Sequence, residues 1–301
     1  MYVLEKPRPG TAGDRHAGTD FLEAYIPGTE TLNTTERPNS KCPRCGEYLG
    51  SLGWLPPYEG ELECWGREFG DIIPKVNGQD MLVSERFKDL YEEAGLVGLT
   101  GFDPVMILRV KRRYRRRVRH DPPPYYRVDA ARSRAAIDLE RSGCVWEVPP
   151  TCRECRENGR GHRRSEAIII EPGTWSGEDI FIPRGGPLLV SSRFKEFCER
   201  QTIRNATFVP AEQYWNCTYY TDDEDRANEL LRRPVGGPIL EKPIRDGHLM
   251  RFDTRTNDVV IYEYVESLRT GRRDLLQLRG HFRPRDAWEF WNRHPSVVAS
   301  Q

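Results

Sequence analysis

Residues 42–46 read CPRCG, and about 40 residues later residues 82–88 read LVSERFK. The same order returns in the second half of the chain, where residues 152–155 read CREC and residues 189–195 read LVSSRFK about 37 residues further on. Six of the seven positions in the later pair of segments are identical. A match of that length, at similar distances from two CxxC pairs, predicts a duplicated unit with a period of about 107–110 residues.

The composition is that of a globular protein with room for about two domains. The chain has 301 residues, of which 37% are hydrophobic and 31% charged, and its formal net charge is zero. A neutral chain has no global field that would draw it onto nucleic acid or a membrane surface. No apolar run approaches the roughly 20 residues that span a bilayer, and residues 1–7 lack the features of a signal peptide. We therefore expect a cytoplasmic protein with no membrane partner.

The eight cysteines favour a metal site over a disulfide framework. Cys42, Cys45, Cys152 and Cys155 would supply the four thiolates of a closed, structural Zn²⁺ site, because equivalent positions in a duplication are brought together by its symmetry. The alternatives are two pairs of buried thiols without a metal, or His162 in place of one thiolate. A catalytic zinc would need an open coordination position and a neighbouring base. The cysteines without a pairing pattern, which we expect to be buried and structural, are Cys64, Cys144, Cys198 and Cys217.

The first copy of the repeated segment predicts a strand, a capped helix and a returning strand. Residues 81–83 are apolar, and Ser84 is placed to cap a helix over residues 85–94. The apolar residues of that helix recur at helical spacing. Residues 105–108 form the returning strand.

The second copy repeats this order with the strand at residues 188–190, Ser191 or Ser192 as the cap, and a returning strand at residues 207–209. Each copy can lay its helix on a sheet. We expect an α+β fold in which duplicated strand–helix–strand units surround a pair of zinc knuckles, followed by a small, mainly antiparallel β domain.

The segment between the copies, residues 109–120, is rich in arginine, and its apolar residues Val110, Tyr114 and Val118 share parity. It is either a solvated edge strand that its charges protect from aggregation, or a docking surface for an acidic protein or a phosphate backbone. The candidate partner-binding residues are Arg112, Arg113, Arg115, Arg116 and Arg117.

The stretch before the second CxxC pair, residues 127–141, contains several alanines and a leucine. These residue types favour helix. We expect a short helix there that leads back to the second knuckle.

The chain divides into three regions by composition. Residues 1–40 are rich in Gly, Pro, Thr and charge and predict a loosely ordered arm with one short strand. Residues 41–215 hold the duplicated domain. Residues 218–301 change in character and predict a separate tail domain.

In the tail, an acidic run at residues 222–225 opens a short helix. Strands are expected at residues 248–253, 258–264 and 276–282, with a hairpin turn at residues 256–257. These elements make the tail mainly antiparallel.

The first of these hairpins carries His248, Arg251, Asp253 and Thr256. A metal-independent ribonuclease needs a base, an acid and a cation that stabilises the phosphorane, and these residue types fit those roles. They are therefore candidate catalytic residues with RNA as substrate. The alternative is that they form only the wet face of a half-exposed hairpin.

The two CxxC pairs and the two LVSxRF segments resemble the double-CXXCG motif proteins of myxobacteria, a family assigned as immunity proteins to Sit-type toxins. The resemblance covers about residues 35–215. It implies a binding protein whose partner is a cognate protein toxin. The second knuckle departs from the family pattern, because Arg156 stands where the family has glycine.

The tail, over roughly residues 220–294, is similar to ribonuclease toxin domains of the barnase–EndoU–colicin–RelE-like group. The similarity is carried by residues 239–242, residues 251–257 and residues 282–284. It departs from that group by an insertion at residues 265–275.

Three functions remain open from the sequence. The leading hypothesis is a zinc-stabilised immunity protein of a polymorphic toxin system. The second is a toxin whose tail is an active ribonuclease carried with an immunity-like domain. The third is a zinc-containing nucleic-acid-binding protein, for which the neutral net charge is unfavourable.

Overall fold

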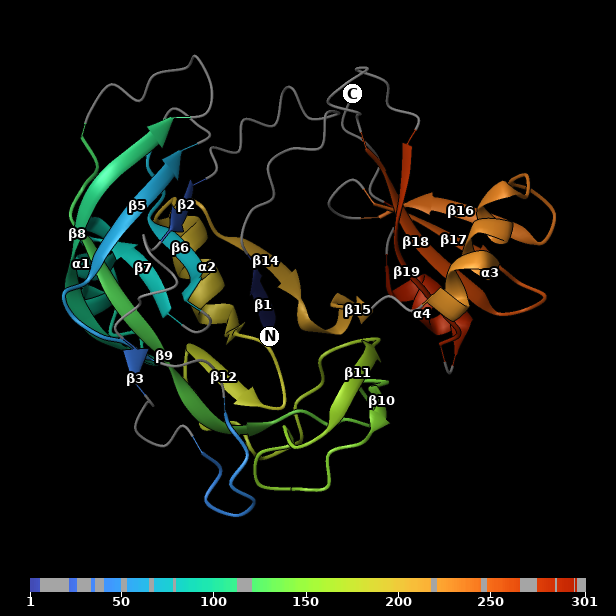
Figure 1. Ribbon diagram of the computed structural model, residues 1–301, viewed down its shortest axis with the longest axis horizontal. Helices are drawn as coiled ribbons and strands as arrows, with labels where there is room; N and C mark the ends of the chain where they lie inside the picture. Colours follow the sequence, from blue (N-terminus) through green and yellow to red (C-terminus); the bar gives the residue numbers. More distant parts are fainter. Residues whose placement is uncertain are drawn as a thin grey trace.

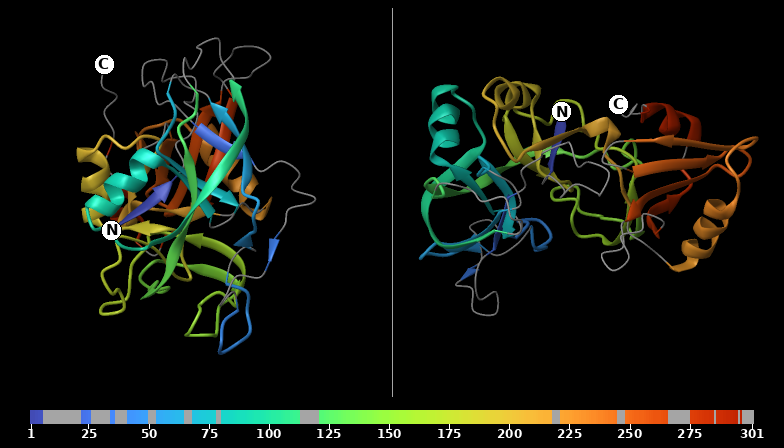
Figure 2. Two further views of the ribbon diagram at one scale, coloured as in Figure 1. Left: turned by 90° about the vertical axis from the view of Figure 1, so that its left-hand side faces the viewer. Right: turned by 90° about the horizontal axis from the view of Figure 1, so that it is seen from above.

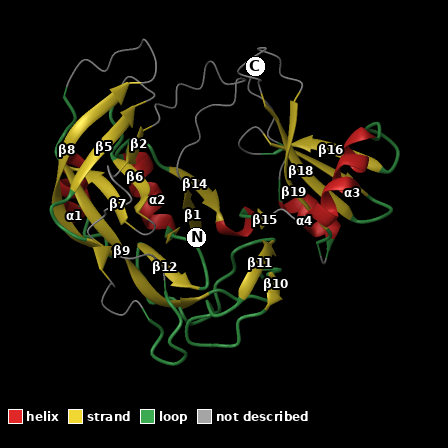
Figure 3. Cartoon of the chain, viewed as in Figure 1, coloured by secondary structure: helices red, strands yellow, loops and turns green. Residues whose placement is uncertain are grey.

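The computed structural model describes residues 1–5, 22–25, 34–35, 41–49, 53–64, 68–77, 80–112, 121–217, 221–244, 248–265, 275–284, 286–294 and 296. A strand-rich part runs from β1 to β15, and a smaller part runs from α3 to α4 (Figure 1). Seen from above, the smaller part lies beside the strand-rich part (Figure 2). Strands make up most of the regular structure, with the helices packed on sheets (Figure 3), so the α+β class is confirmed.

Within the described residues, the largest sheet has ten strands and is curled. Eight follow the order β14-β1-β13-β12-β9-β8-β5-β2, and β7 pairs with both β6 and β9. The pairs are antiparallel except for β12 with β9 and β5 with β8. The strands are β1 (Tyr2–Glu5), β2 (Leu22–Tyr25), β5 (Glu59–Cys64), β6 (Ile72–Asn77), β7 (Asp80–Ser84), β8 (Leu99–Arg112), β9 (Tyr125–Ala136), β12 (Ile180–Arg184), β13 (Leu189–Val190) and β14 (Thr207–Pro210).

Two smaller sheets complete the strand-rich part. One has the order β10-β11-β15 and the other pairs β3 with β4. Their strands are β3 (Thr34–Thr35), β4 (Gly53–Trp54), β10 (Val145–Val148), β11 (Arg160–Ser165) and β15 (Asn216–Cys217), and the short 3-10 helix η1 (Ala211–Gln213) precedes β15.

The N-terminal strand β1 lies inside the large sheet, between β13 and β14. Val3 and Leu4 are buried on its two faces, in different apolar clusters. The first residues of the expected arm therefore belong to the core of the strand-rich part.

Both expected helices begin where their serines predict. α1 (Glu85–Glu93) follows Ser84 and α2 (Ser192–Arg200) follows Ser191. Each serine hydroxyl accepts a hydrogen bond from the backbone N–H three residues later, at 3.1 Å in both helices. The cap satisfies one of the N–H groups that the first turn leaves without a partner.

A buried aspartate accepts a hydrogen bond from each capping serine. In addition, each helix donates a hydrogen bond from an arginine to a carbonyl at the end of the other helix. Asp71 accepts from the Ser84 hydroxyl at 2.8 Å and from Arg86 at 2.8 Å, and Arg86 also donates to the carbonyl of Gln201, which ends α2. The guanidinium of one helix therefore satisfies a carbonyl at the C-terminus of the other.

The second helix makes the matching set of contacts. Asp179 accepts from the Ser191 hydroxyl at 2.9 Å and from Arg193 at 2.9 Å, and Arg193 donates to the carbonyl of Ala94, which ends α1, at 2.7 Å. The repeated sequence thus produces two elements that make equivalent contacts with one another.

The main core lies between these helices and the sheet. Phe87 of α1 packs against Phe194 and Phe197 of α2, with ring centroids 6.2 and 6.1 Å apart. A second cluster on the other face of the sheet includes Leu62 and Tyr125. Burial of several aromatic rings at one contact contributes strongly to stability.

Residues 127–141 are not a helix, as their composition led us to expect. Most of this stretch belongs to β9, which pairs with β8 along one edge and with β7 and then β12 along the other. Val128 and Ala130 point into the core beneath α1, whereas Arg132 and Arg134 are exposed. Pairing on both edges outweighs the weak helix propensity of alanine.

The tail is an antiparallel sheet of order β16-β17-β18-β19. α3 covers one face and α4 the other. The three expected strands and the turn between the first two are confirmed, while β16 is an additional edge strand. The elements are α3 (Thr221–Arg232), β16 (Ile239–Pro243), β17 (His248–Asp253), β18 (Asp258–Val265), β19 (Leu275–Phe282) and α4 (Ala287–Arg293).

The tail contacts the strand-rich part through the segment that precedes β15. His294 forms a hydrogen bond through Nε2 with the carbonyl of Gln213 at 3.0 Å, and Trp215 packs against the core beneath α4. Among the described residues, no helix is long and apolar enough to cross a membrane.

Candidate metal centre

The first CxxC pair lies in a tight turn between two bridged residues, Lys41 and Tyr48. The N–H of Gly46 donates to the carbonyl of Cys42 at 2.9 Å, and Gly46 has a φ of +74°. Glycine adopts this left-handed conformation at little cost, which allows the turn to close behind the two cysteines.

The second CxxC pair forms the same turn without a glycine. The N–H of Arg156 donates to the carbonyl of Cys152 at 2.9 Å, and Arg156 has a φ of +60°. Its side chain is fixed by a hydrogen bond to the carbonyl of Ile137 and by an ion pair with Glu171 at 2.7 Å. The turn therefore forms with Arg156 in the position that glycine occupies in the first knuckle.

Asn158 stabilises the second turn through hydrogen bonds from its side chain, a role that was not predicted from the sequence. Its side-chain oxygen accepts from the N–H groups of Thr151 and Cys152 at 3.0 and 2.9 Å, and its amide donates to the Thr151 hydroxyl at 2.9 Å. Asparagine is a frequent residue in such local side-chain-to-backbone contacts, so its position after the CxxC pair is the signal that could have identified it.

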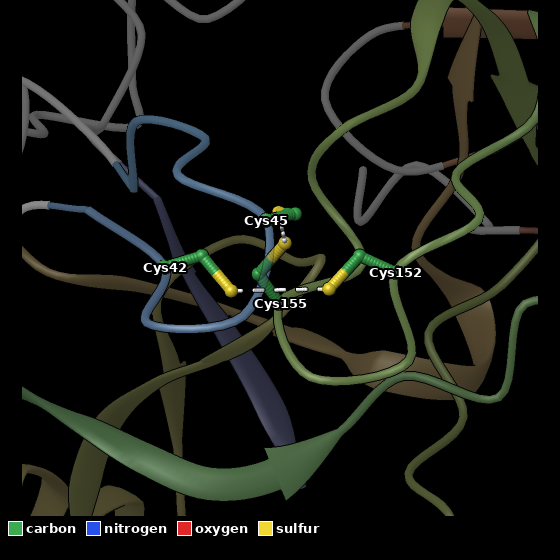
Figure 4. A group of neighbouring side chains, drawn as sticks. All are labelled: Cys42, Cys45, Cys152 and Cys155. Carbon is green, nitrogen blue, oxygen red and sulfur yellow. Dashed lines mark hydrogen bonds between the residues drawn. The ribbon is translucent and has the colours of Figure 1, made fainter.

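The four cysteines meet at one point, as the sequence predicts (Figure 4). Cys42 and Cys152 face each other with their sulfurs 3.8 Å apart, and the sulfurs of Cys45 and Cys155 are 3.6 Å apart. All four sulfurs lie within 4.8 Å of one another. A disulfide requires about 2.05 Å, so these are four free thiols.

These separations fit a single tetrahedral ion. A Zn–S bond of about 2.3 Å places the sulfurs of a tetrahedron about 3.8 Å apart, close to the two shortest separations here. Cys42, Cys152 and Cys155 are buried and Cys45 is exposed. Four thiolates complete the shell of such an ion and leave no position for a substrate, which is the property of a structural site.

The surroundings act in opposite directions on two of the thiols. Burial raises the pKa of Cys155 to about 12, whereas the N–H groups of Cys155 and Glu154 lower the pKa of Cys152 to about 7. Without a cation, the buried group keeps its proton. A divalent ion would stabilise the thiolates and release protons as it binds.

The other candidates for this centre lie elsewhere. His162 does not belong to the four-sulfur group, and its ring packs edge-on against Trp146 with centroids 4.6 Å apart. Cys64 and Cys198 are buried, and Cys144 is partly buried. The side chain of Cys217 lies outside the described residues.

The candidate catalytic residues of the tail do not converge. Arg251 and Asp253 lie on the face of the sheet that α3 covers, whereas His248 lies on the α4 face, where its ring meets that of Trp215. Thr256 is in the turn beyond β17 and lines a cavity of about 260 Å³ with Asp253. Alternate residues of a strand point to opposite faces, so His248 cannot share a site with its odd-numbered neighbours.

Arg251 forms several hydrogen bonds with other residues of the tail. Its guanidinium donates to Glu241 at 2.8 Å and 2.5 Å, and to the carbonyls of Leu230, Leu231 and Arg233 at 3.1, 2.6 and 3.1 Å. These carbonyls lie at the C-terminal end of α3, where the last turn leaves carbonyl groups without partners inside the helix. The guanidinium caps the helix instead of facing a free phosphate site.

The basic segment is only partly described. β8 ends at Arg112, and the side chain of Arg112 lies outside the described residues. Arg113, Arg115, Arg116 and Arg117 also lie outside them. Before that point, Lys111 forms an ion pair with Glu61 at 2.6 Å.

A scan against protein-family models finds no match, and a search of curated proteins finds none either. The case for a metal centre therefore rests on the donor set and its geometry.

Proposed function

We propose that this chain is a zinc-stabilised binding protein that neutralises a cognate protein toxin, and that Cys42, Cys45, Cys152 and Cys155 hold one structural Zn²⁺. The observation that carries the proposal is the convergence of these four thiols from positions 110 residues apart. A tetrahedral set of four sulfurs is typical of zinc or of an iron–sulfur site. The ion would cross-link two distant loops and perform no catalysis.

The repeated segments support a duplicated origin for the zinc-binding part. Ser84 and Ser191 cap equivalent helices, and each helix donates an arginine to the end of the other. We infer that one ancestral strand–helix–strand unit was duplicated and that its two knuckles came together at the pseudo-symmetry axis. A binding role then follows from the resemblance to immunity proteins, with the basic segment after β8 as one contact for an acidic toxin surface.

The metal is tested by elemental analysis of the purified protein. We expect one zinc per chain, lost in Cys155→Ser and retained in Cys144→Ser, because Cys144 lies outside the four-sulfur group. The Cys155→Ser variant should also lose thermal stability, since a structural ion contributes folding free energy. Visible absorbance from bound iron, or a full complement of zinc in Cys155→Ser, would contradict the proposed centre.

The toxin-neutralising role is tested by co-expression with a toxin encoded beside this chain's gene. The full chain should restore growth and co-purify with the toxin. Charge reversal at Arg113, Arg115 and Arg116 should weaken the complex, whereas Arg134→Glu, at an exposed arginine on β9, should not. If the full chain gives no protection while it is folded and expressed, the immunity proposal fails.

A further inference from the structure

A cavity of about 350 Å³ lies directly behind the second knuckle, and no role has been assigned to it so far. One wall is the backbone that follows Cys155, and the others come from β9, β10, β11 and the loop after β12. A volume of this size is within the range of small-molecule sites. The side chains that decide its chemistry are Arg132, Trp146, Arg156, Glu157, His162 and Ser165.

Trp146 provides the strongest sign that the cavity takes a ligand. The residue lines the cavity, and its indole Nε1 is buried. Within the part of the chain that the structure describes, this N–H group has no hydrogen-bond partner. Buried polar groups in folded proteins are almost always paired, so this N–H group calls for an acceptor in the cavity.

The polar side chains of the cavity favour an anion. Arg132 donates only one N–H group to Glu157, at 3.2 Å, among its described contacts. Arg156 also lines the cavity, but its guanidinium is already paired with Glu171 and with the carbonyl of Ile137, so the contact to an anion is assigned to Arg132. A guanidinium recognises a carboxylate in a planar, bidentate way.

The remaining walls are flat and apolar. The Trp146 ring meets His162 edge-on, and Ile168 and Ile182 also line the cavity. Burial lowers the pKa of His162, so its imidazole is mainly neutral near pH 7 and can donate or accept a hydrogen bond. An aromatic or branched apolar body would bury its surface against these walls.

We propose that this cavity binds a small organic carboxylate with a flat apolar body. Its carboxylate accepts hydrogen bonds from Arg132 and from the indole N–H of Trp146, and its apolar body lies against Ile168 and Ile182. This binding site does not depend on the proposed toxin-neutralising role, so the proposal holds whether or not that role is correct.

The proposal is tested by titrating the full-length protein with benzoate in a calorimeter. We expect saturable binding with a Kd of about 1 mM, the range for a ligand of this size. Benzyl alcohol, which keeps the ring and removes the charge, should bind at least about tenfold more weakly because the charge-assisted contact is lost.

Variants separate this site from non-specific binding. Arg132→Ala should weaken benzoate binding about tenfold, whereas Arg134→Ala, two residues along the same strand and outside the cavity, should not change it. Trp146→Phe, which keeps an aromatic ring and removes the N–H group, should weaken binding by a smaller factor and leave the far-UV spectrum unchanged. The proposal is overturned by an absence of saturation at 10-fold above the expected Kd, or by equal affinity in Arg132→Ala and Arg134→Ala.

Discussion

Arg156 shows how one residue can keep a turn whose glycine is missing. Its φ of +60° is close to the +74° of Gly46 in the first knuckle. For a residue with a Cβ atom, this conformation costs about 1–2 kcal/mol. The hydrogen bond to the Ile137 carbonyl and the ion pair with Glu171 offset that cost, since they hold the side chain in place only when the turn is closed.

These opposing effects predict that the glycine variant at position 156 is more stable than the alanine variant. Arg156→Ala loses both side-chain contacts and keeps the free-energy cost of the positive φ. Arg156→Gly loses the same contacts but removes that cost, because glycine adopts a positive φ freely. We expect Arg156→Gly to be more stable than Arg156→Ala by about 1 kcal/mol in chemical denaturation. A glycine variant less stable than the alanine variant would show that the turn is not strained.

At the scale of elements, the paired helices depend on their serine caps. Each cap joins three groups, namely the hydroxyl, the N–H of the first turn and a buried aspartate. The aspartate also accepts from a backbone N–H that follows the opposite helix, since Asp71 contacts Arg204 and Asp179 contacts Val97. Loss of one cap therefore disturbs both helices.

We expect Ser84→Ala and Ser191→Ala each to lower the free energy of unfolding by about 1–2 kcal/mol, by similar amounts. Ser192→Ala, at the exposed residue next to the second cap, should change it by less than about 0.5 kcal/mol. Urea denaturation followed by circular dichroism measures all three. A large effect at Ser192, or none at Ser84, would contradict the assignment of the caps.

The stability of an Arg251 variant distinguishes a structural role for this residue from a catalytic one. Because its guanidinium is mostly buried and joins Glu241 to the end of α3, Arg251→Ala should destabilise the tail by about 3–5 kcal/mol. The matched variant Arg255→Ala, at an exposed arginine in the β17–β18 turn, should cost less than about 1 kcal/mol. An Arg251→Ala variant with wild-type stability would contradict this structural role and favour a catalytic one.

What could be predicted from the sequence depends on how local the determining contacts are. The caps of α1 and α2 need only a serine and the next turn, so both helices were located correctly. β9 needs three partner strands from distant parts of the chain, and its alanines alone suggest a helix. The candidate catalytic residues of β17 do not all lie on one face of the sheet, because His248 and Arg251 are an odd number of residues apart.

At the scale of the whole molecule, the four cysteines were predictable and the cavity behind them was not. The CxxC spacing sets each pair of candidate ligands locally, and the repeated order of segments predicts that the two pairs meet. The cavity is lined from several distant segments, none of which carries a motif. Its position nevertheless connects it to the metal centre, because Arg156 and Glu157 directly follow Cys155, and the N–H of Glu157 contacts the Cys155 sulfur at 3.5 Å.

This connection predicts that the metal and the carboxylate bind cooperatively. An ion at the four cysteines would fix the second knuckle and with it the cavity wall that presents Arg156 and Glu157, so its removal should raise the Kd for benzoate by at least about fivefold, the lower end of typical couplings between sites. Calorimetry before and after treatment with a chelator measures this change, and added zinc should restore the original Kd. Cys45→Ser, which alters the one exposed ligand, provides a milder loss of metal in case the chelated protein unfolds. An unchanged Kd in metal-free protein that keeps its far-UV spectrum would mean that the cavity wall stands without the ion, and that the two sites are independent.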